Sequence, residues 1–245
     1  MNQGYFDIHC HILPGVDDGA GNMEETVRML RMEHKDGVRA VIFTPHYVPS
    51  RSIERNMERA ERIKKVFISV EMECKQLFPD MKFYLGNELY HKSDMIRELD
   101  EKRANTLAGS RYILIEFSTP VSFKELKRAI QNYFLGGYLP ILAHMERYGC
   151  LYNQFERIWE LKDMGCLLQM NTGNFLEGPF SANKRFCMKA LTEGCIDFLG
   201  TDSHDSRIRR PDMAKAVKHL EQKINKALLD KILYENPLRI LEKER

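Results

Sequence analysis

The chain has 245 residues, of which 43% are hydrophobic, and this size suits one large α/β domain or two small ones with a sizeable core. We expect a single domain that spans residues 1–245. The formal net charge of +2 is too small to favour a nucleic acid or a membrane surface as partner. No stretch reaches the roughly 20 apolar residues of a membrane helix, and the N-terminus lacks a signal-peptide pattern, so we expect a cytoplasmic protein without membrane insertion.

The cysteines give the same indication of compartment. None of the six stands in a Cys-x-x-Cys pair, and several lie within apolar runs. This distribution fits a reducing compartment and core positions better than a disulfide framework or a zinc ribbon.

The first predicted strand, residues 5–9, leads into the sequence His9-x-His11. Side chains two apart in a strand point to the same side, so both imidazoles can face one metal ion. The pattern alone is weak, because two surface histidines, or a core histidine beside a surface one, would give the same letters. The polar turn that follows adds Asp17 and Asp18, and carboxylate together with imidazole is typical of divalent metal sites.

Further along the chain, apolar runs alternate with helical patterns. Asn22 and Glu25 have the spacing of a capping box for a helix that ends before Gly37, and further helices are predicted at about 52–77 and at 123–134. The other runs predicted as strands are residues 39–43, 81–85, 111–115, 138–143, 166–170 and 195–199. Two or three helical segments follow the last run.

Residues of metal-ligand type recur directly after these runs. They are His46, Glu88, Glu116, His144, Asp202 and His204. Each alone has an ordinary explanation, since a glutamate can cap a helix and a histidine can be a satisfied core residue. These explanations account poorly for ligand-type residues after nearly every run. The sequence therefore predicts that these residues form one cluster. His34, His91 and His219 lie in presumed helices or loops and are expected to be surface residues.

Seven apolar runs separated by helical segments indicate a mostly parallel sheet, because parallel neighbours need crossover connections that are usually helical. An open sheet and a closed barrel both fit this pattern. The barrel is favoured because its strand ends converge on one face, which would bring together ligands that follow nearly every strand. The first and the seventh strand then become neighbours.

In chain order the motifs are His9-x-His11, Thr-Pro-His46, Gly-Asn-Glu88, Ile-Glu116-Phe, Ala-His144-x-Glu-Arg147-Tyr and Thr-Asp202-Ser-His204. This ordered set resembles the PHP (polymerase and histidinol phosphatase) superfamily. More closely, it is similar to the bacterial manganese-dependent protein-tyrosine phosphatases that are encoded with capsular and exopolysaccharide biosynthesis. The resemblance implies an α/β fold, a distorted seven-stranded TIM-like (β/α)7 barrel known as the PHP fold, with a metal site at the C-terminal face of the strands.

The resemblance also implies which residues hold two or three divalent ions. One ion would take His9, His11, Glu88 and Asp202, a second Glu88, Glu116 and His144, and a third Asp18, His46 and His204. Manganese is the implied metal, although nitrogen and oxygen ligands also admit iron, cobalt or zinc. Arg147 corresponds to the substrate-phosphate arginine and is expected to act in catalysis together with Glu88 and His204.

The activity implied by the resemblance is hydrolysis of phosphotyrosine on a protein partner, a bacterial tyrosine autokinase that controls polysaccharide export. Metal ions can lower the pKa of a bound water to roughly 7, while the rigid fork of Arg147 binds the phosphate. The other interpretation of Arg147 is a salt bridge with Glu146. Cys10 and Cys150 lie near the site loops without the arginine of a Cys-x5-Arg motif, so thiolate catalysis is not expected.

Two other functions stay open at this point. One is a small-molecule phosphatase of the same superfamily, such as histidinol phosphatase, and the other is a non-catalytic regulatory domain. The complete ligand set argues against the second, because burying so many charged groups without a metal is costly. The resemblance favours Asp18 over Asp17 as a ligand. Four loop arginines could either widen an electropositive mouth or be solvated charges: Arg51, Arg207, Arg209 and Arg210.

Overall fold

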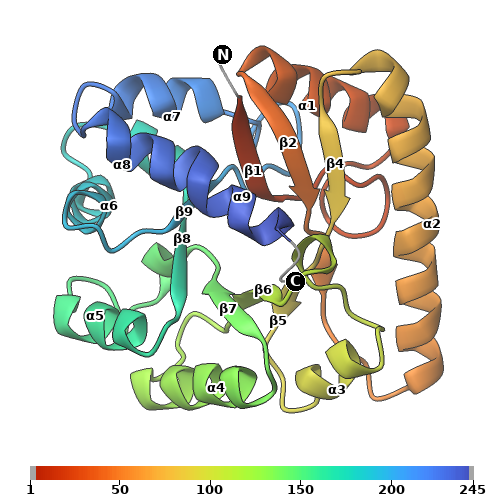
Figure 1. Cartoon of the computed structure of the whole chain (residues 1–245), viewed down its shortest axis with the longest axis horizontal. Helices are drawn as coiled ribbons and strands as arrows, with labels where there is room; N and C mark the ends of the chain where they lie inside the picture. Colours follow the sequence, from red (N-terminus) through yellow and green to blue (C-terminus); the bar gives the residue numbers. More distant parts are fainter. Residues whose placement is uncertain (1–3, 243–245) are drawn as a thin grey trace.

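A computed structural model of the chain describes residues 4–242 (Figure 1). Within that range the strands are β1 (Tyr5–Cys10), β2 (Val38–Phe43), β3 (His46–Tyr47), β4 (Lys82–Leu85), β5 (Glu88–Tyr90), β6 (Tyr112–Glu116), β7 (Leu139–Leu142), β8 (Leu167–Asn171) and β9 (Phe198–Gly200). The α-helices are α1 (Met23–Lys35), α2 (Ile53–Leu77), α3 (Met95–Asp100), α4 (Phe123–Leu135), α5 (Phe155–Asp163), α6 (Ala182–Thr192), α7 (Met213–Leu220), α8 (Lys226–Asp230) and α9 (Asn236–Leu241). A π-helical turn (Lys231–Glu235) joins α8 to α9, and 3-10 turns lie at η1 (Leu107–Gly109), η2 (Met145–Arg147) and η3 (Thr172–Leu176).

Local sequence signals explain where the helices begin. Asn22 caps α1 by accepting a hydrogen bond from the backbone N–H of Glu25 (2.9 Å). The carboxylate of Glu25 accepts from the backbone N–H of Ser206 (2.7 Å), so it holds the loop after β9 instead of closing the predicted capping box. Ser122 and Glu125 do form a complete capping box at the start of α4. None of the helices in residues 4–242 is both long and apolar enough to cross a membrane.

The strands of the described residues form two parallel sheets, in the orders β1-β2-β4 and β3-β5-β6-β7-β8-β9. β2 leads into β3 after Thr44 and Pro45, and β4 leads into β5 after Gly86 and Asn87. The backbone N–H of Gly86 donates to the carbonyl of Phe43 (2.8 Å), so the two breaks lie side by side. The second and third predicted strands are therefore each followed by a further short strand, β3 and β5, which raises the strand count above the seven expected from the apolar runs.

The first strand lies beside the last, as predicted. Cys10 and Ser203 form an isolated parallel bridge. The backbone N–H of His11 donates to the carbonyl of Ser203 (2.8 Å), and that of Asp202 donates to the carbonyl of His9 (2.8 Å). No ladder of paired strands joins β1 to β9 within residues 4–242. The structure thus shows a curled parallel α/β fold, and closure into a seven-stranded barrel stays a prediction.

Helices surround the curled sheets (Figure 1). Alternate side chains of the strands belong to a buried cluster inside the curl. The buried members of the interior cluster are Phe6, Ile8, Ala40, Ile42, Leu107, Leu114, Ile141, Ala143, Phe198 and Ile240. Intervening residues such as Val41 and Ile115 belong to a larger cluster that includes helix residues such as Leu30 and Leu126. The strands therefore share an apolar interior, and the polar residues that follow them lie at one end of it.

Candidate metal centre

The nine predicted ligand residues meet at the carboxyl ends of the strands. Three groups have ligand atoms within 4.8 Å of one another: His11, Asp18, His46 and His204; His9, His11 and Asp202; and His46, Glu88 and Glu116. His144 joins them through its Nε2 atom, which lies 2.8 Å from Oε1 of Glu88. The structure therefore brings the whole predicted set together, while the role of these residues as metal ligands stays a prediction.

A β-bulge in β1 aims the first two histidines. Between residues 7 and 10 the pairing with β2 shifts, so that three steps along β1 match two steps along β2. The extra residue lets Ile8 face the apolar interior while His9 and His11 face the cluster, with their Nε2 atoms 3.3 Å apart. Gly200 leaves room for this arrangement, because a Cβ atom there would lie 2.7 Å from the Cβ atom of His9.

Glu88 lies at the centre of the cluster and is fully buried. Its carboxylate oxygens lie 2.8 Å from Nε2 of His144, 2.8 Å from Nδ1 of His46, 3.3 Å from Nε2 of His11 and 3.4 Å from Nε2 of His9. Burial by itself would raise the pKa of this carboxyl. The charge of His9 and hydrogen bonds from the other three histidines instead hold that pKa well below its usual range. Glu88 is therefore an anion on which four imidazoles converge.

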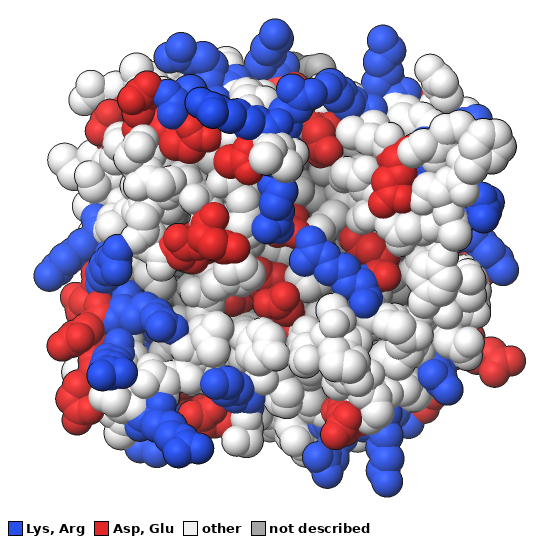
Figure 2. All heavy atoms as spheres, turned by 180° about the vertical axis from the view of Figure 1, so that it is seen from behind, with Lys and Arg blue, Asp and Glu red and all other residues white. Residues whose placement is uncertain are grey.

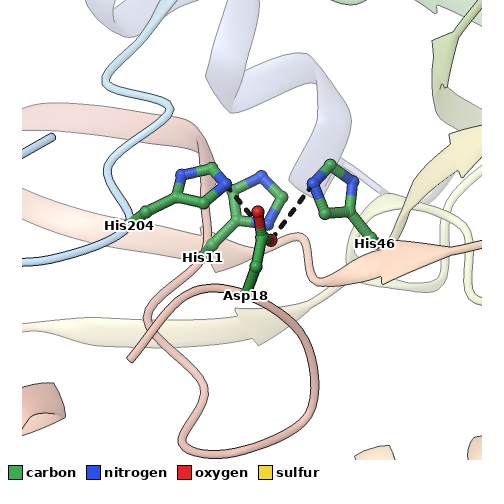
Figure 3. Close-up of side chains that lie close together, drawn as sticks. All are labelled: His11, Asp18, His46 and His204. Atoms are coloured by element: carbon green, nitrogen blue, oxygen red, sulfur yellow. Dashed lines mark ion pairs between the residues drawn. The ribbon is translucent and has the colours of Figure 1, made fainter. Parts of the chain in front are cut away.

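The two adjacent aspartates in the turn after β1 occupy different positions. Asp18 lies between two imidazoles, with its Oδ1 atom 3.4 Å from Nε2 of His46 and 3.5 Å from Nε2 of His204 (Figure 3). Asp17 lies behind His11, 2.8 Å from its Nδ1 atom, and accepts a hydrogen bond from the backbone N–H of His46 (2.9 Å). Asp18 is thus placed to bind a metal, whereas Asp17 orients the neighbouring side chains.

Two amides that the sequence reasoning missed support the cluster from the side of β8. Oε1 of Gln169 accepts from the backbone N–H of His144 (2.7 Å) and lies 3.1 Å from Nδ1 of His9. Nε2 of Gln169 donates to Asn171 (2.9 Å), whose own amide donates to Oδ2 of Asp202 (2.8 Å). The available signal was a glutamine inside an apolar strand, because a buried amide needs polar partners.

The backbone is strained at two of the strand ends. His144 and Asp202 have positive φ angles of 32° and 50°. Non-glycine residues rarely adopt this left-handed region, which costs about 1–3 kcal/mol per residue. Both residues direct their side chains into the cluster, so the strain is concentrated where polar groups converge.

The donor set fits a divalent cation. Nε2 of His204 is buried and has no hydrogen-bond partner among residues 4–242, although it faces Asp18. Burial lowers the pKa values of His9 and His11, but the carboxylates around them, Glu88 among these, shift both upward overall. Because a metal ion binds the lone pair of a neutral imidazole, metal binding here would be coupled to proton release. Nitrogen and oxygen donors in this mixture suit manganese, iron, cobalt or zinc.

Two arginines approach the cluster from solvent and share one carboxylate. Nη2 of Arg147 lies 2.6 Å from Oδ2 of Asp202, and Nη2 of Arg209 lies 3.1 Å from Oδ1. Their side chains are 40% and 42% exposed, so both can also reach a bound molecule. Arg147 therefore pairs with Asp202 and not with Glu146.

The three other loop arginines are exposed: Arg51, Arg207 and Arg210. Figure 2 shows acidic side chains in a hollow near the middle of one face, with basic side chains beside them.

The cysteines do not offer a nucleophile. Five of the six are buried, and Cys150 is partly buried. Burial raises the pKa of the Cys10 thiol well above its usual range. The prediction that the cysteines fill the core is therefore confirmed for all but Cys150.

His91 departs from its prediction as a surface residue. It is half-buried, its Nδ1 atom lies 2.9 Å from the hydroxyl of Tyr133, and its ring lies 4.8 Å from that of Phe117. The physical reason is that β5 ends directly before His91, so α4 and the end of β6 pack over the imidazole.

Comparison with known proteins gives close matches along nearly the whole chain. The family model for capsular polysaccharide synthesis, CpsB/CapC, matches residues 5–242. The chain is 34% identical over 241 residues to the tyrosine-protein phosphatase CpsB of Streptococcus agalactiae serotype V, covering 96% of this chain and 98% of that protein. It is 31% identical over 240 residues to CpsB of Streptococcus pneumoniae, with coverages of 96% and 97%. The tyrosine-protein phosphatase YwqE of Bacillus subtilis is 28% identical over 232 residues, with coverages of 91% and 86%.

Solved structures give the same result. A structure from work on YwqE of Bacillus subtilis and CpsB of Streptococcus pneumoniae, described as unique metal-dependent tyrosine phosphatases, matches with a TM-score of 0.81 and 26% identity, covering 98% of this chain and 95% of that chain. The phosphotriesterase homology protein of Escherichia coli shares the fold alone, with a TM-score of 0.64, 14% identity and coverages of 99% and 100%. From its match across residues 5–242, the chain belongs to the CpsB/CapC family of capsular polysaccharide synthesis.

Proposed function

We propose that the chain is a metal-dependent protein-tyrosine phosphatase whose active site is the cluster around Glu88. The observation that carries this proposal is the gathering of nine ligand-type side chains, the buried Glu88 among them, in one cluster, with two arginines at the solvent side. The names of the similar proteins from Streptococcus agalactiae and Streptococcus pneumoniae, and the metal dependence stated for the similar structure, support it.

We propose manganese as the metal, in two or three ions, of which the first two would share Glu88; iron, cobalt or zinc would also suit the donors. The ligands are His9, His11, Asp18, His46, Glu88, Glu116, His144, Asp202 and His204. The Nδ1 atom of His46 lies 2.8 Å from Glu88 and its Nε2 atom lies 3.4 Å from Asp18, so either nitrogen, but only one of them in a neutral imidazole, would be a ligand. Nε2 as the ligand would agree with the division expected from the sequence, in which His46 belongs to the third ion.

Bound metal ions supply a hydroxide near neutral pH and neutralise phosphoryl charge. The chain's own residues position these groups. The guanidinium of Arg147 exchanges its partner Asp202 for the phosphoryl oxygens, which its planar fork binds at two points. Nδ1 of His204 lies 2.9 Å from the carbonyl oxygen of Asp202, and donation to that carbonyl leaves Nε2 as the lone pair that faces the centre. Glu88 holds the imidazoles in place.

We propose that the substrate is a phosphotyrosine protein of capsular or exopolysaccharide synthesis, such as a bacterial tyrosine autokinase. The family description supports this setting. We place the protein in the cytoplasm, because all six cysteines are free, which fits a reducing compartment. We also treat residues 1–245 as one domain with a distorted seven-stranded barrel, since strands of both sheets contribute to the same apolar interior.

The central experiment measures metal content and phosphotyrosine-peptide hydrolysis on the same purified protein. A chelator should abolish hydrolysis, and added manganese should restore it. Thiol alkylation should spare most activity, with Cys10→Ser as a control, because Cys10 lies between two proposed ligands. Activity in the Cys10→Ser protein that resists chelator and is lost on alkylation would contradict the metal-dependent mechanism.

The same assay separates the other two functions. A histidinol phosphatase would turn over histidinol phosphate faster than a phosphotyrosine peptide when both are measured side by side. A non-catalytic domain would bind metal without hydrolysing either compound. We expect the peptide to be the better substrate.

A further inference from the structure

A pocket of about 480 Å³ lies beside the cluster, between α3 and α4. Its volume is within the range of about 300–1,000 Å³ that is common for ligand pockets. Phe117, Tyr133 and Ala129 are buried residues of its lining, and the ring of His91 lies 4.8 Å from that of Phe117. Aliphatic side chains of α3 and of the loop before α4 complete the walls. The lining therefore combines an aromatic and aliphatic part with polar and charged residues.

This pocket begins one residue beyond a proposed metal ligand. In the parallel pair of β5 and β6, Tyr90 lies opposite Glu116, and the backbone N–H of His91 donates to the carbonyl of Glu116 (2.8 Å). The carboxylate of Glu116 lies at the cluster, whereas the next residue, Phe117, lines the pocket. The same two strand ends thus separate the cluster from the pocket, and a polypeptide bound across them would contact both.

The lining also carries positive charge that an anion can use. Arg128 on α4 forms neither a hydrogen bond nor an ion pair with the residues that the structure describes, and Lys92 has a single long contact, 3.5 Å from the carbonyl of Pro49. The carboxylate of Glu125 is engaged in the capping box of α4, where it accepts from the hydroxyl of Ser122 (2.7 Å). The charge of Arg128 helps to lower the pKa of Glu125, but the two form no ion pair, so an acidic group could still pair directly with the guanidinium of Arg128.

We propose that this pocket is a substrate subsite, which binds an aromatic side chain near the phosphotyrosine while an adjacent acidic residue pairs with Arg128. The inference rests on the proposed function, because it specifies the polypeptide that the same active site would accept. Aromatic walls favour an aromatic ring, and the cations at the pocket favour a carboxylate next to it. The enzyme would thus prefer phosphotyrosine in segments rich in aromatic and acidic residues.

Synthetic peptides test this preference. One phosphotyrosine peptide carries a Phe-Glu pair, placed in turn at each of four positions on either side of the phosphotyrosine. In matched peptides the phenylalanine is replaced by alanine, or the glutamate by glutamine. At the best position we expect kcat/KM to fall about tenfold for the alanine peptide, because an apolar ring is no longer buried. We expect a fall of about threefold for the glutamine peptide, because the charge pair is exposed.

Two pairs of variants locate the effect. Arg128→Glu reverses the charge of the pocket, and Lys124→Glu makes the same change on an exposed residue of α4 outside the lining. Asn132→Trp fills the pocket from α4, and Gln131→Trp adds the same ring at the exposed neighbouring position outside the lining. We expect Arg128→Glu and Asn132→Trp to remove the preference for the Phe-Glu peptide, and their partners to keep it.

A small aryl phosphate, measured with every variant, separates failure of the subsite from failure of the proposed function. Equal rates on all peptides, or pocket variants that behave like their controls, would overturn the subsite while aryl phosphate is still hydrolysed. An unchanged protein that hydrolyses neither the peptides nor the aryl phosphate when loaded with metal would contradict the proposed phosphatase itself.

Discussion

Nη2 of Arg147 lies 2.6 Å from Oδ2 of Asp202, although the two residues are 55 positions apart in the chain. One follows β7 and the other follows β9, so the contact links two strand ends across the mouth of the cluster. A guanidinium held on a proposed metal ligand is already close to where a phosphoryl group would bind.

Replacing Arg147 with alanine should leave metal binding intact and lower turnover of an aryl phosphate about 100-fold or more, because the developing phosphoryl charge loses its bidentate partner. Turnover and metal content are measured on the same sample. Arg147→Lys keeps the charge but lacks the planar fork, so its turnover should lie between that of the unchanged protein and that of Arg147→Ala. Near-normal turnover of Arg147→Ala would leave the arginine with a structural role only.

Arg209 offers a second contact of the same kind. Its guanidinium lies 3.1 Å from Asp202, and the carboxylate of Asp205 shapes its loop by accepting from the backbone N–H groups of Arg207 and Ile208 (both 2.6 Å). Arg209→Ala should lower kcat/KM about tenfold through loss of a charged hydrogen bond to the phosphate. Arg207→Ala, two residues away and exposed, is the control and should change kcat/KM little. Equal effects of the two changes would argue for a general charge effect.

Glu88→Gln should remove bound metal and activity together while the fold persists. The amide has nearly the shape of the carboxylate but lacks the charge on which four imidazoles converge. Metal analysis and far-ultraviolet circular dichroism check the two parts of this expectation. A variant that still held its full complement of metal would exclude Glu88 as a shared ligand.

Asp212 provides a prediction on stability and pH away from the cluster. Burial raises its pKa to about 6, from an ordinary value of about 4. The folded state therefore holds this proton more tightly than the unfolded chain does, so the contribution to stability is complete below about pH 4 and is lost as pH rises through about 6.

Asp212→Asn carries no charge at any pH and can still accept the hydrogen bond from the hydroxyl of Thr172. Compared with the unchanged protein, this variant should gain about 1–2 kcal/mol in free energy of unfolding as pH is raised from about 5 to about 7.5. Urea unfolding at both pH values measures the gain. A difference between the two proteins that did not change with pH would contradict the assignment.

Much of the site was predictable from sequence because ligand-type residues follow apolar runs. The candidates His46, Glu88, Glu116 and His144 lie at or just beyond the ends of β2, β4, β6 and β7, and parallel strands bring such ends to one face. The bulge that aims His9 was not predictable, because a shift in pairing register depends on the partner strand.

The supporting residues were harder to predict for a related reason. Gln169 stands out in the sequence only as a glutamine inside an apolar strand, and its role depends on His144 and His9, which reach it only in the folded chain. Asp17 and Asp18 are equivalent as letters, and only the turn decides which one faces the cluster. The breaks after Phe43 and Leu85 were also hidden, because a short polar interruption reads as the end of a strand and not as a bend within it.

The bridge between Cys10 and Ser203 has a consequence for synthesis on the ribosome. His9 is made near the start of translation, and Asp202 is made 193 residues later. At translation rates of about 5–20 residues per second, the two are separated by roughly 10–40 s. Nascent chains that end before Thr201 should therefore lack the metal ion that we propose for His9, His11, Glu88 and Asp202, a result that metal analysis of stalled complexes can check. Assembly of the proposed centre would then be complete only after the last strand has been made.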